Sequence, residues 1–228
     1  MLQLVIGNKN YSSWSMRPWV LLRHFGIEFD EIKLRFDFSP DSSFYRELAR
    51  YTPAARVPVL LIDGFAVWDT LAIAETLADR FPDLPLWPRE PAQRARARSL
   101  AAEMHAGFTA LRNHCPMNIE AALPEVGARM LAAEADLRRD LARIDAMWRG
   151  QLAASAGPFL FGEFGAVDAY YAPVAARVRT YALPLSAPAQ AYVERLWASP
   201  GVSAWVSDAL AERDFLDFEE PYRQSAAS

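Results

Sequence analysis

The spacing of apolar residues divides the chain into two unlike parts: the first mixes the two-residue period of strands with the spacing of helices, and the second has helical spacing only. In the first 80 residues, short apolar runs and two-residue alternations predict strands at residues 2–6, 32–36, 57–62 and 65–68. Helix-like segments lie between or after them at residues 19–25, 44–51 and 69–80. Asp63-Gly64 separates the last two strand segments and is typical of a hairpin turn. The predicted order is therefore β-α-β-α-β-β-α.

The rest of the chain predicts helices only. Three prolines between residues 81 and 88 indicate a linker, which we place at 81–91. Beyond it, alanine, leucine and arginine dominate helical segments at residues 92–115, 125–154, 168–181, 189–198 and 202–212. The sequence thus predicts an α/β domain at 1–80 and an all-α helical-bundle domain at 92–228. The polar, small-residue tail after Phe218 is expected to fray.

The charge, the cysteine count and the lengths of the apolar runs argue against several classes of protein. The 228 residues include 24 basic and 28 acidic ones, and the formal charge of −4 leaves no basic surplus for nucleic acid or an anionic membrane. The single cysteine, Cys115, excludes an internal disulfide and a CxxC zinc pattern. No apolar run is long enough for a membrane span, and the N-terminus does not read as a secretory signal. We therefore expect a cytoplasmic protein.

The first candidate site is the serine-rich segment before the first predicted helix, which reads YSSWSMR at residues 11–17. A helix N-terminus lowers the pKa of a nearby thiol, and a hydroxyl there stabilises the thiolate by a charge-assisted hydrogen bond. The same serines also suit ordinary helix capping. The start of a predicted helix is uncertain by about two to four residues, so Ser12 and Ser13 both remain candidates.

Two further segments combine turn chemistry with a binding role. Arg56-Val57-Pro58 opens a predicted strand, and a proline costs no ladder hydrogen bond there. If the Val57–Pro58 bond is cis, the backbone of Val57 turns outward, and its exposed N–H and C=O could pair with an extended ligand as a short strand would. Asp69 and Thr70 precede a helix, where either residue can act as its N-cap. A capped helix N-terminus is also a site for an anion, so the two interpretations are compatible.

The order of elements, the proline linker, the helical second half and these three segments together resemble the cytosolic glutathione transferases. Residues 11–17 are similar to the Ser-Ser-Cys-Ser-x-Arg stretch of the zeta class, with Trp14 where that class has cysteine. The resemblance implies a thioredoxin-like N-terminal domain that binds glutathione as co-substrate. It also implies a helical C-terminal domain that forms the pocket for an electrophile, and a homodimer.

The resemblance assigns roles to individual residues. Ser12, with Ser13 adjacent, would donate to the thiolate. Residues 56–60 match the family's x-Val-Pro-x-Leu motif with its cis proline, so Val57 would pair with the cysteinyl backbone of glutathione, and Arg56 and Pro58 would bind glutathione beside it. Residues 69–75 are similar to the Glu/Gln-Ser-x-Ala-Ile motif, so Asp69 and Thr70 would hold the γ-glutamyl end.

The electrophile pocket is expected on the first helix of the second half. His105, Phe108, Leu111, Arg112 and Cys115 fall on one face of a single predicted helix at residues 92–115. Ordinary core packing explains such a stripe equally well. Phe108 and Arg112, with Tyr11 and Trp14 from the N-terminal segment, are the predicted pocket residues, since a half-buried arginine usually meets an anion.

One further motif concerns the fold rather than the chemistry. Residues 161–168 are similar to the Ser/Thr-x-x-Asp capping motif that precedes a core helix in the family, with Gly165 at the cap position. Glycine is tolerated there, and Asp168 can bond back to the start of the helix.

Other chemistries find little support. His24, His105 and His114 are far apart in the sequence. The side chains of the neighbours His114 and Cys115 would point in different directions on a helix, so no metal site is expected. No GxSxG elbow and no glycine-rich phosphate loop occur. The basic cluster at residues 94–98 is best explained as a solvated helix face.

We therefore predict a glutathione transferase that joins the glutathione thiolate to a small, partly apolar electrophile. One alternative is glutathione-dependent cis–trans isomerisation of a maleyl-type diacid, for which Arg17 and Arg112 are candidate carboxylate anchors. Another is a non-catalytic glutathione-binding or scaffold protein on the same fold. The identity of the second substrate does not follow from the sequence.

Overall fold

A computed structural model describes residues 1–155 and 157–225. Its N-terminal region contains one four-stranded sheet with the strand order β2-β1-β3-β4. The strands are β1 (Leu2–Ile6), β2 (Asp30–Lys33), β3 (Val59–Ile62) and β4 (Phe65–Val67). β1 runs parallel to β2 and antiparallel to β3, and the predicted turn at Asp63-Gly64 joins β3 to β4 as a hairpin.

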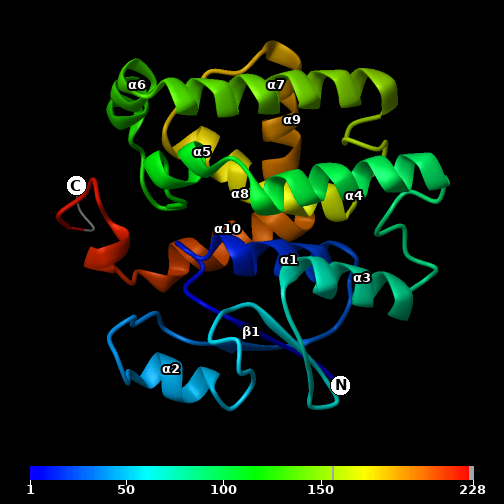
Figure 1. The fold of residues 1–228 in the computed structure, drawn as a ribbon, viewed down its shortest axis with the longest axis vertical. Helices are drawn as coiled ribbons and strands as arrows, with labels where there is room; N and C mark the ends of the chain where they lie inside the picture. The colour runs from blue at the N-terminus through cyan, green and yellow to red at the C-terminus, as the bar shows by residue number, and fades with distance from the viewer. Residues whose placement is uncertain (156, 226–228) are drawn as a thin grey trace.

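Three helices cover this sheet: α1 (Ser13–His24), α2 (Ser43–Leu48) and α3 (Thr70–Arg80). Figure 1 shows α1 and α3 on the side of the sheet that faces the other helices, with α2 on the opposite side. β1 serves both faces, because Leu4 and Ile6 join the main core while Val5 joins the smaller cluster toward α2. The arrangement confirms the predicted thioredoxin-like architecture.

The second strand differs from the predicted 32–36. β2 begins at Asp30 and ends at Lys33, although the amide of Leu34 still donates to the carbonyl of Ile6 at 2.8 Å. Its partner β1 ends at Ile6, so no strand remains to pair with Phe36. The alternation read from the sequence reflects the buried cluster toward α2, which Leu34 and Phe36 both contact, rather than the sheet ladder.

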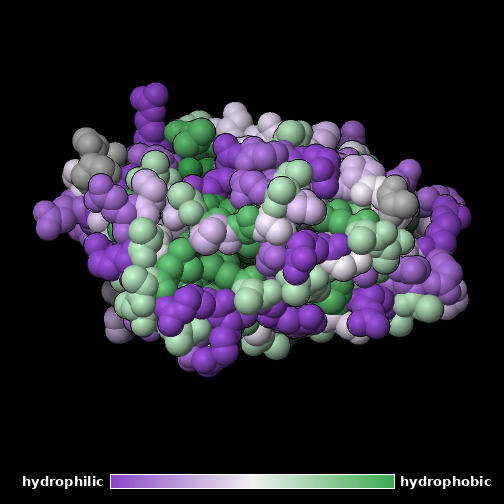
Figure 2. Space-filling model, turned by 90° about the horizontal axis from the view of Figure 1, so that it is seen from above, coloured by the Kyte–Doolittle hydropathy of each residue, from purple (hydrophilic) through white to green (hydrophobic). Residues whose placement is uncertain are grey.

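The second half is helical, as predicted. It contains α4 (Pro91–Ala106), α5 (Thr109–His114), α6 (Pro124–Ala133), α7 (Ala135–Ser155), α8 (Ala166–Thr180), α9 (Ala187–Ala198), α10 (Pro200–Glu212) and the 3-10 turn η1 (Asp217–Glu219). α8 is almost entirely buried and packs against α1, α4 and α9, while α10 packs against α1. Seen from above, hydrophilic residues cover much of this half, and apolar ones gather in a central strip (Figure 2). Because α1 packs against β1 on one side and against α8 and α10 on the other, it lies between the sheet and the helical layer.

The capping match before α8 is confirmed. The Asp168 carboxylate accepts hydrogen bonds from the amides of Gly165 and Leu160 and from the hydroxyl of Tyr192. Burial raises the pKa of Asp168 to about 6. Three donors satisfy this buried group, which fixes the start of the central helix.

The single helix predicted at 92–115 is wrong. The helix ends at Ala106 instead. A Cβ at Gly107 would lie 2.7 Å from the carbonyl oxygen of Glu103, and Phe108 adopts a positive φ of 53°. Arg112 donates to the carbonyls of His105 and Gly107, which the break leaves open. The predicted helix at 125–154 is likewise interrupted, at residue 134 between α6 and α7.

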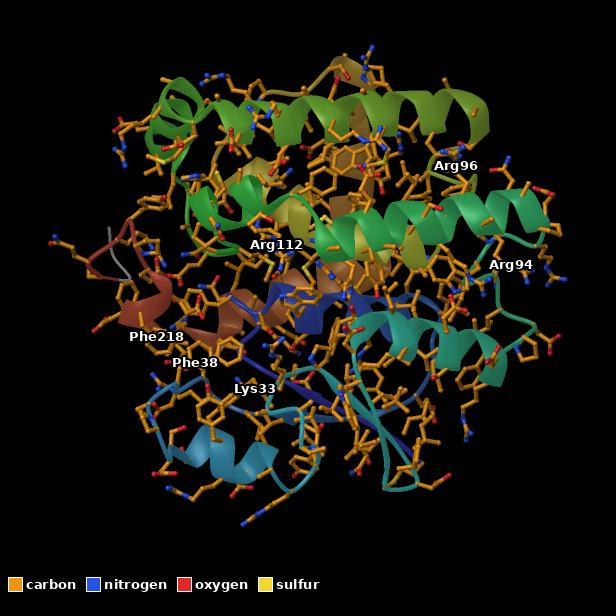
Figure 3. The ribbon with its side chains drawn as sticks, in the orientation of Figure 1. Lys33, Phe38, Arg94, Arg96, Arg112 and Phe218 are labelled. Atoms are coloured by element: carbon orange, nitrogen blue, oxygen red, sulfur yellow. The ribbon has the colours of Figure 1, made fainter. Side chains whose placement is uncertain are left out.

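The C-terminal segment does not fray over the part that the structure describes. This segment contacts both halves of the molecule, and the Tyr11 hydroxyl donates to the buried Glu220 carboxylate at 2.7 Å. Arg223 forms an ion pair with the same carboxylate, and the rings of Phe38 and Phe218 are 5.2 Å apart (Figure 3). Fraying was predicted from the polar composition of this segment alone, whereas in the structure its burial and its ion pair hold it in place.

Candidate functional site

A cleft of about 970 Å³ is lined by residues of both halves of the molecule. Ten of the eleven predicted site residues line it: Tyr11, Ser12, Ser13, Trp14, Arg56, Val57, Pro58, Asp69, Thr70 and Arg112. Phe108 is absent from this lining. It is 7% exposed and belongs to the main hydrophobic core, because the break before α5 turns it inward. The fold thus gathers three separate sequence segments into one place.

Ser12 lies at the N-cap position of α1, but its side chain makes no capping hydrogen bond. Its hydroxyl instead donates to the Ser15 hydroxyl at 2.7 Å, and Ser15 also accepts from the amide of Gly7 at 3.2 Å. Both serines are buried. Hydroxyl hydrogens rotate freely, so Ser15 can donate to Ser12 in turn and leave the Ser12 hydrogen for a ligand. The pair is a short relay that ends in the cleft.

The neighbouring hydroxyls are placed differently. Tyr11 donates to Glu220 and accepts from the amide of Leu216, and burial raises its pKa to about 12. Ser13 is half-buried on the first turn of α1, and no hydrogen bond among the described residues uses its hydroxyl. Only Ser12 therefore combines burial, a second hydroxyl behind it and a position at the start of α1.

Val57 presents unpaired backbone to the cleft. The Val57–Pro58 peptide bond is cis, and β3 begins only at Val59. Among the described residues, no backbone hydrogen bond uses the N–H or C=O of Val57. Unpaired backbone groups at the end of a strand can accept an extended peptide as an added strand.

The start of α3 carries a polar network. Asp69 caps the helix by accepting from the amide of Leu71 at 3.1 Å, and Thr70 is buried. The His105 imidazole, from the last turn of α4, lies 3.2 Å from an Asp69 oxygen through Nε2 and 3.5 Å from the Thr70 hydroxyl through Nδ1. Tyr170 of α8 donates to the same Thr70 hydroxyl at 2.9 Å. Both predicted γ-glutamyl contacts are thus held by the helical half.

Arg56, Arg112 and Arg177 bring positive charge to the cleft lining, whereas Arg17, a predicted carboxylate anchor, is buried beside Trp14 and does not line the cleft. Arg17 is 1% exposed and stacks on Trp14 at 4.1 Å and on Tyr170, while its Nε and Nη1 have no hydrogen-bond partner. Arg112 lies 4.8 Å from the Trp14 ring, between α5 and α1 (Figure 3). Arg177 donates only to backbone carbonyls of Cys115 and Pro173.

Burial lowers the pKa of Arg17, Arg112 and Arg177, to about 9 for Arg17 and about 10 for Arg177, and Arg112 further lowers the pKa of the other two. Among the described residues, no carboxylate forms an ion pair with Arg17, Arg112 or Arg177. Positive charge that lacks an internal partner favours an anionic ligand.

The cleft-lining residues that sequence reasoning missed include three with side chains that can carry charge: His105, Arg177 and Glu219. His105 was considered as a metal ligand and as part of the helix face that could line the electrophile pocket, but it was not among the predicted site residues. Arg177 falls inside a helix that reads as core, and Glu219 lies in the segment expected to fray. Burial and the adjacent Glu220 raise the pKa of Glu219 to about 7. No local spacing signals these residues, because each reaches the cleft only through tertiary packing.

The residues set aside from the sequence lie elsewhere. His24 stacks on Phe164, and His114 lies 3.7 Å from Glu134, so these histidines are far from His105 and its partners. Among the described residues, no group of three or more His, Cys, Asp or Glu could hold a metal ion. Arg94 and Arg96 lie on the part of α4 remote from Arg112 (Figure 3). No helix within residues 1–155 or 157–225 is both long and apolar enough to cross a membrane.

Comparison with known proteins identifies relatives of this arrangement. A family profile described as the N-terminal domain of glutathione S-transferase matches residues 11–80. A probable maleylacetoacetate isomerase of Caenorhabditis elegans is 32% identical over 101 residues, which cover 44% of this chain and 45% of that protein. The match spans less than half the length of each such isomerase. A probable glutathione transferase of Aplysia californica is 32% identical over 85 residues, which cover 37% of this chain and 87% of that protein.

Solved structures share the fold over nearly the whole chain. A glutathione transferase homologue from Burkholderia, with bound glutathione, superposes with a TM-score of 0.69 at 22% identity and covers 91% of this chain and 97% of its own. A tau-class glutathione S-transferase from mango gives a TM-score of 0.68 at 17% identity, over 92% of this chain and 96% of its own. The two-part architecture is therefore shared at low sequence identity.

Proposed function

Because the chain belongs to the cytosolic glutathione transferase superfamily, we propose that it binds glutathione and transfers the glutathione thiolate to a small electrophile. The observation that carries this proposal is the meeting of three groups in one cleft. These are the buried Ser12 hydroxyl at the start of α1, the unpaired backbone of Val57, and Asp69 with Thr70 at the start of α3. Each group matches one part of the tripeptide in chemistry.

The contacts follow from the donor and acceptor types. The backbone of Val57 would pair with the cysteinyl N–H and C=O, with Arg56 and Pro58 beside it. Asp69 would accept from the γ-glutamyl ammonium, while Thr70 and the first amides of α3 would bind its carboxylate. Ser12 would then donate to the thiolate. Three separated contacts of this kind fix a flexible tripeptide in one orientation.

The reaction needs a larger thiolate fraction at neutral pH than free glutathione provides. A charge-assisted hydrogen bond from Ser12, the positive end of α1 and the nearby arginine charge all stabilise the thiolate over the thiol. The sulfur electron pair then forms a carbon–sulfur bond, and the leaving group departs with its own pair. Holding both substrates in the cleft adds the advantage of proximity.

The test is a titration of the ultraviolet thiolate absorbance of glutathione bound to the wild-type protein. We expect a midpoint at least about one pH unit below that of free glutathione. Conjugation of a chlorinated dinitrobenzene should accompany it. Saturable binding with an unshifted midpoint and no turnover would leave a binding protein, and no binding at all would overturn the proposal.

A second candidate function is cis–trans isomerisation of a maleyl-type diacid. The thiolate would add to the double bond, the resulting single bond would rotate, and elimination would restore glutathione. Two observations favour it: the similarity to maleylacetoacetate isomerases, and the unpaired charges of Arg112 and Arg177 in the cleft, which suit two carboxylates. Turnover of maleylacetone compared with the chlorinated aromatic separates the two reactions.

Three further expectations remain proposals. The domain boundaries at 1–80, 81–91 and 92–228 can be tested by limited proteolysis, which should cut first in the linker. The homodimer implied by the family can be tested by analytical ultracentrifugation. A cytoplasmic location can be tested by cell fractionation.

A further inference from the structure

One imidazole contacts both residues that the proposed function assigns to the γ-glutamyl end of glutathione. His105 lies on α4, in the helical half, whereas Asp69 and Thr70 begin α3 in the N-terminal half. Nε2 is 3.2 Å from the Asp69 carboxylate and Nδ1 is 3.5 Å from the Thr70 hydroxyl. His105 also lines the cleft and is about one-fifth exposed, so it is placed to respond to both ligand and solvent.

The hydrogen bonds around Thr70 select one tautomer of this imidazole. The Thr70 hydroxyl accepts from Tyr170, so its own hydrogen is free to point at Nδ1. With Nδ1 as acceptor, Nε2 carries the ring hydrogen and donates to Asp69. The neutral imidazole thus satisfies both neighbours and leaves the full negative charge on Asp69.

The surroundings favour this neutral form. Burial lowers the pKa of His105, and the positive charges of Arg17 on α1 and Arg112 on α5 lower it further, against the opposing effect of Asp69. The other group packed on the ring is the indole of Trp14, edge-on at 5.0 Å. These are the charged and aromatic groups that face His105 from α1, α3 and α5.

We propose that His105 is a positioning residue for glutathione: its neutral imidazole orients the Asp69 carboxylate toward the γ-glutamyl ammonium, and its protonation weakens binding. The proposal rests on the proposed function, because it needs glutathione in this cleft. A protonated imidazole would neutralise Asp69 and repel the ammonium across a short distance. Affinity for glutathione should therefore fall as the pH drops below the imidazole pKa.

The experiment measures binding of S-methylglutathione by calorimetry at pH 5 and pH 7.5. This probe has no thiol, and any titration of its ammonium near pH 7.5 is common to wild type and the variants, so it cancels in the comparison. His105→Leu removes both hydrogen bonds, and we expect its Kd to rise about tenfold at pH 7.5. His105→Gln keeps an N–H near the Nε2 position without a titrating ring, so its Kd should stay within about threefold of wild type.

The pH dependence separates positioning from a merely structural role. Wild type should bind several-fold more weakly at pH 5 than at pH 7.5, and His105→Gln should lose most of that difference. Any contribution from Glu219, which also lines the cleft and titrates in this range, persists in the Gln variant and cancels in the comparison. Steady-state kinetics should show a larger change in KM for glutathione than in kcat.

His114→Leu is the matched control, because His114 lies at the end of α5 beside Glu134 and is outside the cleft lining. It should bind the probe as wild type does. If wild type fails to bind the probe, the proposed function fails. If wild type binds but both His105 variants keep its affinity and its pH profile, the inference is overturned while the proposed function stands. Circular dichroism confirms that each variant is folded, and the Gln variant remains decisive if the Leu variant is not.

Discussion

The two walls of the cleft are built in different ways. The N-terminal wall places small polar groups and open backbone among aromatic rings: the Ser12 hydroxyl, the Val57 edge and the start of α3 lie in the same lining as rings such as Trp14. The helical wall presents long side chains, among them His105, Arg112 and Arg177. The first wall therefore matches the polar groups of one peptide-like ligand, while the second offers charge that can adapt to many ligands.

The difference suits two separate tasks, which are the recognition of one fixed ligand and the accommodation of ligands of different shapes. Backbone atoms and short side chains lose little conformational entropy on binding, so they recognise a fixed ligand well. Arginine side chains pay more entropy and rely on charge, which acts at longer range and tolerates different ligand shapes. His105 crosses from the second wall to the first, which is why its removal is expected to affect glutathione binding rather than the electrophile.

The largest effect should come from Ser12→Ala, which removes the proposed thiolate donor from the N-terminal wall. Loss of one hydrogen bond to a developing or full anion in a buried site costs about 100-fold in rate. We expect kcat/KM to fall by about that factor and the thiol pKa of bound glutathione to rise toward that of free glutathione. Ultraviolet titration and conjugation kinetics measure the two quantities.

Ser13→Ala, one residue away, should lose far less activity, because Ser13 lacks the buried hydroxyl partner that Ser12 has. Ser99→Ala is a neutral control, since its hydroxyl bonds only to a carbonyl on the exposed side of α4. A larger loss in Ser13→Ala than in Ser12→Ala would move the thiolate donor by one position.

The sequence alone predicted the two walls of the cleft to different extents. Several residues of the N-terminal wall were predictable because their signals are local: the Asp69 cap and the serines at the start of α1 act within a few residues, as does the Asp63-Gly64 hairpin elsewhere in this half. The thioredoxin-like order of elements follows from the same local periods. The roles of these residues in binding stay predictions until they are tested.

The helical wall was not predictable in the same way. Helix propensity favours an unbroken segment from 92 to 115, whereas the break at Gly107 depends on contacts from elsewhere, such as the bond from the Leu111 amide to Asp140 on α7. Tyr11 and Glu220 are 209 positions apart, yet their hydrogen bond anchors the C-terminal segment. Such pairings leave no trace in the spacing of either partner.

The next largest effect tests the charge of the helical wall. Arg112→Gln removes one of the arginine charges that line the cleft and should raise the KM of a maleyl diacid about tenfold, because an ionic hydrogen bond to a carboxylate is lost. The KM of a neutral chlorinated aromatic should change by less than about threefold. Steady-state kinetics with both substrates measure the ratio.

Arg96→Gln provides the control, since Arg96 is exposed on a distant part of α4 (Figure 3). Arg112 also bonds the carbonyls exposed by the helix break, so Arg112→Gln should lower the thermal midpoint slightly. An equal loss for the charged and the neutral substrate would mean that Arg112 acts only through that structural role.

A smaller effect tests the relay behind Ser12. Ser15→Ala removes the second hydroxyl and leaves the amide of Gly7 without its acceptor. We expect conjugation to fall about fivefold, in line with the loss of one neutral hydrogen bond, and the thiol pKa to rise by a fraction of the change in Ser12→Ala. Ser15→Thr keeps the hydroxyl and should restore the thiol pKa. A thiol pKa in Ser15→Ala equal to that of wild type would contradict the relay.

The smallest effect concerns Glu219, which brings a carboxyl to the cleft from the C-terminal segment. Its pKa is raised by burial and by Glu220, to about 7 against an ordinary 4.5, so the folded state holds this proton more tightly than the unfolded state does. The associated stability is complete below about pH 4.5 and is lost as the pH rises through about 7. At pH 8 the buried charge is therefore a cost, and Glu219→Gln should stabilise the protein by about 1 kcal/mol, which raises the thermal midpoint by about 2–4 °C.

The gain should disappear near pH 4.5, where glutamic acid and glutamine are both neutral. Glu28→Gln, at an exposed carboxylate that has no ion pair among the described residues, is the matched control. Glu219 lines the cleft, so removing its charge also makes the cleft more positive at high pH. A maleyl diacid should therefore bind slightly more tightly to Glu219→Gln than to wild type at pH 8, and equally at pH 5. A stabilisation that is the same at both pH values would show that Glu219 acts through its shape rather than its charge, and the positive potential of the cleft would then depend on the arginines alone.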